Sequence, residues 1–114
     1  MTTNYKIKAT PTFKISLDKL TSFLTRKFSA VLAREVKRKI KNRVEEQLST
    51  APYSSPASER LVELGIVDYR QLLIDEHNIV LYRVDDTNNT VVLLLTIDSR
   101  QDLEKLLFEI NILT

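Results

Sequence analysis

Three arginines in the C-terminal half of the chain carry the side chains best suited to chemistry on phosphate. Arg70, Arg83 and Arg100 each lie in, or just beyond, a segment predicted to be a β-strand. A guanidinium group binds phosphate through two parallel hydrogen bonds and can stabilise the charge that develops when a phosphodiester is cleaved. The alternative is that each arginine forms a structural ion pair with a nearby carboxylate. The candidate carboxylates are Asp68, Asp85, Asp98 and Asp102.

Cleavage of a phosphodiester would also need a general acid and base, for which the sequence offers few candidates. Tyr69 and Tyr82 each directly precede one of these arginines, and we interpret them as aromatic residues at the edge of the core or as part of a target-binding surface. The single histidine, His77, falls in a predicted turn, where we expect an exposed residue without a catalytic role. Asp98 and Glu104 are the remaining candidates.

A second cationic surface is predicted on a helix. Residues 26–43 contain eight lysines and arginines but one glutamate, although the net charge of the whole chain is only +2. The residues that we assign to a basic helix face are Arg34, Lys37, Arg38 and Lys41. Such a face is either a solvated surface opposite an apolar stripe or a binding surface for nucleic acid or an acidic partner.

The elements that would position these residues are three consecutive strands, predicted at residues 67–74, 78–84 and 90–97. They are rich in Val, Ile, Leu and Tyr, and short polar clusters separate them. Loops this short connect antiparallel neighbours. A short helix over residues 102–107 is expected to follow.

The N-terminal half predicts a strand followed by two helices. The segment 5–13 is β-prone but contains Pro11, which places the strand at a sheet edge or ends it near Thr10. Ser16 is the expected N-cap of the first helix, with Asp18 in its first turn. The apolar residues expected to be buried on this helix are Leu17, Leu20, Leu24 and Phe28.

The second helix is predicted over residues 30–48, because apolar residues recur there at every fourth position. These residues are Leu32, Val36, Ile40, Val44 and Leu48. A loop over 49–58 then joins the helical half to the sheet half, and Ser58 is expected to cap a short helix that ends at Gly65 with positive φ. The result is an α+β fold with a mostly antiparallel sheet and two helices on one side.

The last strand is apolar on both faces, from Val91 to Leu95. Two helices would cover one face of the sheet. For the other face, the chain offers only the short helix and the tail from Phe108 to Leu113. We therefore expect some apolar sheet surface to remain open for a partner.

Composition limits the class of protein. The chain has 114 residues, of which 43% are hydrophobic, which predicts a single domain over residues 1–114. It has no cysteine and one histidine, so we expect no metal site, no cofactor and no disulfide. One glycine cannot build the phosphate, dinucleotide or nucleophile loops, and we expect no small-molecule substrate. The absence of a long apolar stretch predicts a soluble, cytoplasmic protein away from membranes.

The order of motifs in the C-terminal half resembles the RelE/ParE superfamily of bacterial type II toxin–antitoxin toxins. A Tyr-Arg strand, a second Tyr-Arg strand, an apolar strand and an Arg-Gln-Asp-Leu helix start follow one another. The matching residues are Tyr69-Arg70, Tyr82-Arg83-Val84-Asp85, Val91 to Ile97 and Ser99-Arg100-Gln101-Asp102-Leu103. The helical pattern that ends at Leu48, and Pro52 after it, fit the same family.

The resemblance implies a toxin that arrests growth and is neutralised by a cognate antitoxin, whose flexible segment lies on the toxin. Some members of the superfamily are ribosome-dependent mRNA endonucleases, in which Arg70, Arg83 and Arg100 would be catalytic. Others, resembling ParE, bind and poison DNA gyrase and are not nucleases. Because no Tyr or His follows Arg100, we favour the ParE-like branch. The alternatives are the RelE-like endonuclease and a non-toxic adaptor that binds protein or RNA.

Overall fold

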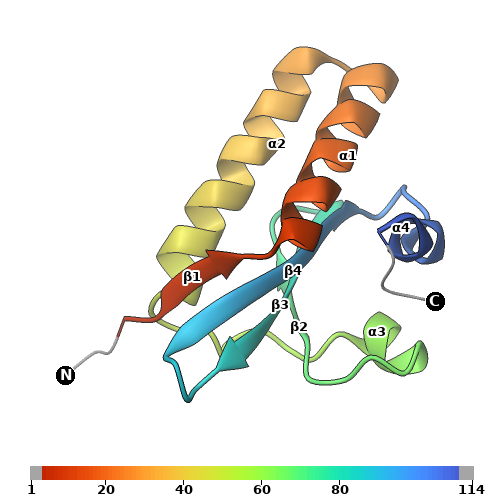
Figure 1. Cartoon of the computed structure of the whole chain (residues 1–114). Helices are drawn as coiled ribbons and strands as arrows, with labels where there is room; N and C mark the ends of the chain where they lie inside the picture. The colour runs from red at the N-terminus through yellow and green to blue at the C-terminus, as the bar shows by residue number, and fades with distance from the viewer. Residues whose placement is uncertain (1–3, 111–114) are drawn as a thin grey trace.

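The fold is an α+β arrangement around one sheet. The computed structural model describes residues 4–110. In chain order its elements are β1 (Lys6–Ala9), α1 (Pro11–Lys27), α2 (Ala30–Arg43), the π-helical turn η1 (Val44–Leu48), α3 (Glu59–Glu63), β2 (Arg70–Leu73), β3 (Asn78–Asp85), β4 (Thr90–Asp98) and α4 (Leu103–Glu109). The predicted order of strand, two helices, three-strand meander and short C-terminal helix is confirmed (Figure 1).

The sheet has the strand order β1-β4-β3-β2, so the N-terminal strand lies at an edge, as the proline predicts. β1 runs parallel to β4, with Ile7 opposite Val91, whereas the other neighbours are antiparallel. A bulge lies where Leu81 pairs with Leu95 but Tyr82 pairs with Leu93. The extra residue in β4 changes the face to which its odd-numbered residues point, so Val91 and Leu93 pack with one set of helices and Leu95 and Ile97 with the other.

The first helix begins at Pro11, and the prediction that Ser16 caps it is wrong, as is the placement of Asp18 in its first turn. Thr10 is the N-cap, its Oγ1 accepting a hydrogen bond from the Phe13 amide at 3.0 Å. Proline is well suited to the first helical position, because the N–H that it lacks would have no partner there. The Thr-Pro pair therefore starts the helix earlier than the serine could.

Ser16 is instead buried inside α1, where it joins the helix to the sheet. Its hydroxyl donates a hydrogen bond to the carbonyl of Phe13 at 2.7 Å and accepts one from the Thr96 amide at 3.0 Å. β1 pairs with β4 only as far as Ala9, opposite Leu93. Ser16 thus provides an acceptor for β4 beyond the end of β1.

The two long helices bury most of the predicted apolar positions. On α1, Leu20 and Leu24 are buried and Leu17 is half-buried, but Phe28 is 47% exposed, so its predicted burial is wrong. The reason is that α1 ends at Lys27 and the ring of Phe28 lies at the C-cap. On α2 and η1, the stripe is confirmed except that Leu32 is only half-buried. Its buried members are Val36, Ile40, Val44 and Leu48.

The segment before β2 differs from the prediction. The strand begins at Arg70 and not at residue 67, because Asp68 adopts a φ of 72°, which interrupts extended structure. Upstream, the predicted cap and turn are confirmed. The Ser58 hydroxyl accepts a hydrogen bond from the Leu61 amide at 3.4 Å, and Gly65 has a φ of 81° after α3.

Two apolar cores lie on opposite faces of the sheet. The α1/α2 core packs those helices on sheet residues that include Leu72, Val80, Tyr82, Val91 and Leu93. The α3/α4 core packs the short helices on Leu81, Leu95 and Ile97. The expectation of open apolar surface is wrong for β4, since its residues 91–98 are all buried, although Leu73 of β2 is 55% exposed. The short helices α3 and α4, of five and seven residues, cover this second face of the sheet, which we had expected a partner to cover.

The C-terminal helix is longer than predicted and is capped by Asp102, whose carboxylate accepts a hydrogen bond from the Lys105 amide at 3.1 Å. Phe108 is 63% exposed, whereas Ile110 packs against the α3/α4 core. The rest of the predicted tail, residues 111–113, lies outside the described residues. Within residues 4–110, no helix has both the length and the apolarity to cross a membrane.

Candidate functional surfaces

Arg70 is held by the loop that follows η1. Its guanidinium lies 4.9 Å from the centre of the Tyr53 ring, and its Nη1 donates hydrogen bonds to the carbonyls of Tyr53 at 3.3 Å and Ser55 at 2.6 Å. The ion pair considered for Arg70 is therefore replaced by contacts with backbone carbonyls and an aromatic ring. These contacts fix the loop against β2 and engage both N–H groups of Nη1.

Arg100 is fixed by a carboxylate of the same turn, as the structural alternative predicts. Its Nε and Nη2 donate to the two oxygens of Asp98 at 2.8 and 2.6 Å, and its guanidinium lies 4.4 Å from the centre of the Phe28 ring. Asp98 is fully buried. Burial alone would raise the pKa of Asp98, but the hydrogen bonds and positive charge of Arg100 lower it overall.

Arg83 lies on the other face of the sheet from the two long helices. It pairs in register with Val92, which also pairs with Lys8 of β1, so Lys8 and Arg83 flank Val92 in one row. Lys6 lies two residues from Lys8 on the same side, and we call Lys6, Lys8 and Arg83 the basic sheet patch. Hydrogen bonds from Asn88, and the positive charge of Arg83, lower the pKa of the Asp85 carboxyl. Together they outweigh burial, which raises it.

The three arginines do not converge on one site. Arg70 pairs with Tyr82 and therefore shares its face, whereas Arg83, the next residue along β3, points to the opposite face. Arg100 follows Asp98, which pairs with Asn78 at the far end of β3 from Arg83. The structure thus separates the side chains that an endonuclease would need to bring together.

The candidate acid–base residues are not aligned with the arginines either. Tyr82 is fully buried and its hydroxyl donates to the carbonyl of Pro52 at 2.5 Å, as expected for a core aromatic. Tyr69 precedes β2 and packs, half-buried, against the α3/α4 core. His77 lies in the β2–β3 turn, where its ring is 3.4 Å from both Ser99 Oγ and Glu76 Oε1.

One polar cluster is not visible in the sequence. Asp86 accepts hydrogen bonds from the hydroxyls of both Tyr5, at 3.3 Å, and Tyr53. The hydrogen bond to Asp86, followed by burial, raises the pKa of Tyr53 to about 12. The partners lie 81 and 33 residues from Asp86 in the chain, so no local spacing could reveal them. The cluster ties β1 and the loop after η1 to the β3–β4 turn.

The basic helix residues surround an apolar groove between α2, the start of α1 and β1, which we call the α2 groove. It has a volume of about 750 Å³. Its apolar surface is provided by Ile7, Phe13, Leu17, Ile40, Val44 and Leu93. All four predicted residues, Arg34, Lys37, Arg38 and Lys41, line it together with Glu45. Four cations against one carboxylate give this groove a positive potential.

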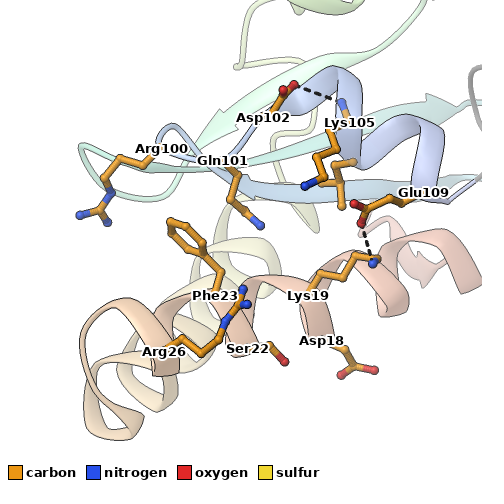
Figure 2. A pocket seen from close by; sticks show the side chains of 11 residues that line it. Asp18, Lys19, Ser22, Phe23, Arg26, Arg100, Gln101, Asp102, Lys105 and Glu109 are labelled. Carbon is orange, nitrogen blue, oxygen red and sulfur yellow. Dashed lines mark hydrogen bonds and ion pairs between the residues drawn. The ribbon is translucent and has the colours of Figure 1, made fainter.

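A second cleft, of about 630 Å³, lies between α1 and the β4–α4 turn. Gln101 and Lys105 reach from the turn and α4 toward Phe23 and Arg26 on α1 (Figure 2). An ion pair of 2.7 Å between Lys19 and Glu109 links the two helices across it. Charges of both signs line this cleft, so their sum favours no class of ligand. Within residues 4–110, no cluster of three metal-binding side chains occurs.

Comparisons with solved structures place the fold among toxin–antitoxin proteins. A chain of the toxin–antitoxin complex RelBE2 from Mycobacterium tuberculosis is 21% identical, with a TM-score of 0.56 over 83% of this chain and 91% of that chain. A chain of the chromosomal ParDE system from P. aeruginosa is 15% identical, with a TM-score of 0.65 over 82% of this chain and 95% of that chain. At these identities the likeness concerns the fold alone.

The sequence comparison gives the family. No curated protein matches the chain. The family model described as "ParE toxin of type II toxin-antitoxin system, parDE" matches residues 7–104. The matched segment contains β2, β3, β4 and both long helices. It also contains β1 apart from its first residue, Lys6, and the start of α4. The chain therefore belongs to the ParE toxin family of type II toxin–antitoxin systems.

Proposed function

We propose that this toxin binds and poisons DNA gyrase and does not cleave mRNA on the ribosome. The observation that supports this choice is the separation of the three arginines, two of which are held in place by hydrogen bonds to acceptors within the protein. Cleavage of a phosphodiester requires cations and an acid–base pair within hydrogen-bonding distance of one reacting group. A poison requires only a surface that holds its target.

The basic sheet patch is the surface that we assign to target contact. Lys6 and Lys8 are exposed and Arg83 is half-exposed, and no ion pair involves them among the described residues. Val92 belongs to neither apolar core yet is only 9% exposed, which we attribute to the aliphatic stems of Lys8 and Arg83 on either side. Such stems hold the charged ends over the sheet, where they suit the phosphates of DNA bound by gyrase.

The α2 groove is the surface that we assign to the antitoxin. Its apolar lining would bind the apolar side chains of a partner segment, and its cationic rim would favour a segment rich in Asp and Glu. An antitoxin segment that is disordered when free could order itself in this groove. In this proposal one domain, in the cytoplasm, carries both surfaces, and neither needs a cofactor.

The first test is a gyrase supercoiling and DNA-cleavage assay with purified protein, run with and without the product of the neighbouring gene. We expect cleaved DNA to accumulate with the toxin alone and to disappear when the neighbouring product is added. Arg83→Ala should weaken the effect at least about fivefold, whereas Arg60→Ala, an exposed arginine on α3, should leave it unchanged. Circular dichroism and thermal unfolding would verify that both variants remain folded.

Two results would contradict the proposal. Full gyrase activity in the presence of excess toxin, together with cleavage of mRNA on programmed ribosomes, would establish the RelE-like endonuclease. Normal growth after induction of the gene, with neither assay affected, would indicate a non-toxic adaptor. An Arg83→Ala variant as active as Arg60→Ala would remove the basic sheet patch from the interface while leaving the gyrase assignment intact.

A further inference from the structure

Gln101 is held in one orientation in the cleft between α1 and the β4–α4 turn. Its main-chain N–H donates to the carbonyl of Asp98, and its side-chain Oε1 accepts a hydrogen bond from the Asp98 amide, each at 2.9 Å. Because that amide is a donor, it fixes the oxygen toward Asp98 and leaves the two N–H groups of Nε2 on the side of α1 (Figure 2). Within residues 4–110, these two groups have no acceptor.

The wall of the cleft opposite Gln101 carries the aromatic ring of Phe23. This residue is half-buried, because it packs partly against the α1/α2 core. Figure 2 shows its ring rising from α1 toward the turn that carries Gln101. A planar ring of this kind is a surface on which a nucleic-acid base stacks. A base against Phe23 would therefore present its edge to the free donors of Gln101.

The carboxylates that line the cleft are occupied or directed elsewhere. Glu109 is paired with Lys19 at 2.7 Å. The carboxylate of Asp102 is the N-cap of α4 and accepts a hydrogen bond from a main-chain amide of that helix. Asp18 points away from the turn and from α4 in Figure 2. The negative charge facing the middle of the cleft is therefore smaller than the list of lining residues suggests.

Two cations of the cleft remain without a partner. Arg26 on α1 and Lys105 on α4 both line it, from opposite walls, and neither forms an ion pair among the described residues. Arg100 differs, because Asp98 holds its Nε and Nη2. An anion between α1 and α4 would therefore meet two unpaired positive charges, and phosphate forms strong hydrogen bonds with such groups.

We infer that this cleft binds a nucleoside phosphate. The base lies against Phe23 with one edge on Gln101, and the phosphate is held from the two walls by Arg26 and Lys105. The volume of about 630 Å³ is within the range of about 300–1,000 Å³ that is usual for small-molecule sites. This inference goes beyond the proposed action on gyrase and does not depend on it.

The engaged oxygen of Gln101 also predicts which base is preferred. Guanine presents two neighbouring acceptors, O6 and N7, whereas adenine presents one acceptor beside the donor N6. Gln101 offers donors toward the cleft and no oxygen, so guanine matches it better. A free nucleotide and the 5′-terminal nucleotide of a single strand share this chemistry, and the experiment distinguishes the two sources.

The test is a titration of the full-length, ¹⁵N-labelled protein, followed by nuclear magnetic resonance. Guanosine 5′-monophosphate should shift the side-chain NH₂ signals of Gln101 and the amide signal of Phe23. Adenosine 5′-monophosphate should bind at least about threefold more weakly, because its edge places a donor against a donor. Inorganic phosphate alone should leave the NH₂ signals of Gln101 unchanged.

Two substitutions separate the contacts of the base from those of the phosphate. Gln101→Glu keeps an oxygen for the Asp98 amide but replaces the donor group, and should weaken binding of the guanosine nucleotide at least about tenfold. Arg26→Gln should weaken it about fivefold. Lys27→Gln is the matched control for Arg26, because it changes the charge equally one residue further on but does not line the cleft, and should have less than about a twofold effect.

Thermal unfolding would verify that the variants remain folded, and the comparison of Arg26→Gln with Lys27→Gln decides if Gln101→Glu does not fold. A short single strand that begins with a 5′-phosphorylated guanosine identifies the source. Tighter binding of the strand through the same signals assigns the cleft to a strand end, and weaker binding assigns it to a free nucleotide.

Three results would overturn the inference. They are unchanged Gln101 signals at millimolar guanosine nucleotide, equal binding of the adenosine and guanosine nucleotides, and an equal response to inorganic phosphate. Equal losses in Arg26→Gln and Lys27→Gln would likewise show attraction by net charge and no site. None of these results bears on the gyrase assay, so the two proposals fail separately.

Discussion

Ser16 offers the sharpest test of how the helical half is attached to the sheet. Its buried hydroxyl accepts the hydrogen bond of the Thr96 amide, so Ser16→Ala leaves a buried donor without a partner. The cost of such a group is about 1–3 kcal/mol, and the better helix propensity of alanine returns about 0.5 kcal/mol. We expect the free energy of unfolding to fall by about 1–2 kcal/mol, measured by urea denaturation.

A second substitution at the same position distinguishes this role from that of a helix cap. Aspartate replaces serine at an N-cap with little loss, but a carboxylate buried without a partner costs about 3–5 kcal/mol. Ser16→Asp should therefore be more harmful than Ser16→Ala. Ser22→Ala, at an exposed position on α1, should change stability by less than about 0.5 kcal/mol. Tolerance of aspartate at Ser16 would refute this account of the attachment.

Three further predictions follow from individual hydrogen bonds. Tyr82→Phe should destabilise the fold by about 1–2 kcal/mol, because a buried carbonyl loses its donor, whereas Tyr69→Phe should have little effect in the same urea titration. The lowered pKa of Asp98 contributes stability above about pH 4 that is lost as the pH falls below it, so Asp98→Asn should flatten the acid limb of the thermal unfolding profile. Asp86→Ala should return the pKa of Tyr53 from about 12 toward its usual value near 10, visible in the ultraviolet absorbance of tyrosinate; an unchanged titration would exclude Asp86 as the cause.

The order of elements was accessible from the sequence because it depends on local signals. The spacing from Val36 to Leu48 defines the second helix, polar clusters separate the strands, and Gly65 marks the end of α3 through its positive φ. The start of α1 was also accessible in principle. Thr10 followed by Pro11 is a helix start, and it takes precedence over Ser16 because it stands immediately after the strand.

Local signals in the sequence could not predict that α3 and α4 cover the second face of the sheet. α3 and α4 contribute few apolar residues each, and neither would be stable alone. Leu61 and Leu107 become fully buried only because the chain returns twice to the same face. A pattern along one segment does not contain that information, so the apolar strand suggested an open surface that the fold closes.

The surroundings of the three arginines could not be predicted for a related reason. Each arginine had a carboxylate nearby in sequence, yet only Arg100 is paired with one of those considered, Asp98. Arg70 is held by carbonyls of the loop at Tyr53 and Ser55, which no spacing rule connects with it. The cationic residues at the α2 groove could be predicted because they share one helix, whereas its apolar lining comes from five elements, β1, α1, α2, η1 and β4.

The loop after η1 contacts both the β2 edge of the sheet and one of the three arginines. This loop leaves the α2 end of the molecule, uses carbonyls to hold Arg70, and then runs along β2 through Pro56 and Ser58. It thereby occupies one edge and one arginine at the same time. Among residues 4–110, the outward amides of Ile7 and Ala9 have no backbone partner and the basic sheet patch has no ion pair. The loop therefore covers the β2 edge of the sheet, whereas the β1 edge, which carries Lys6 and Lys8, lies at the opposite side of the sheet.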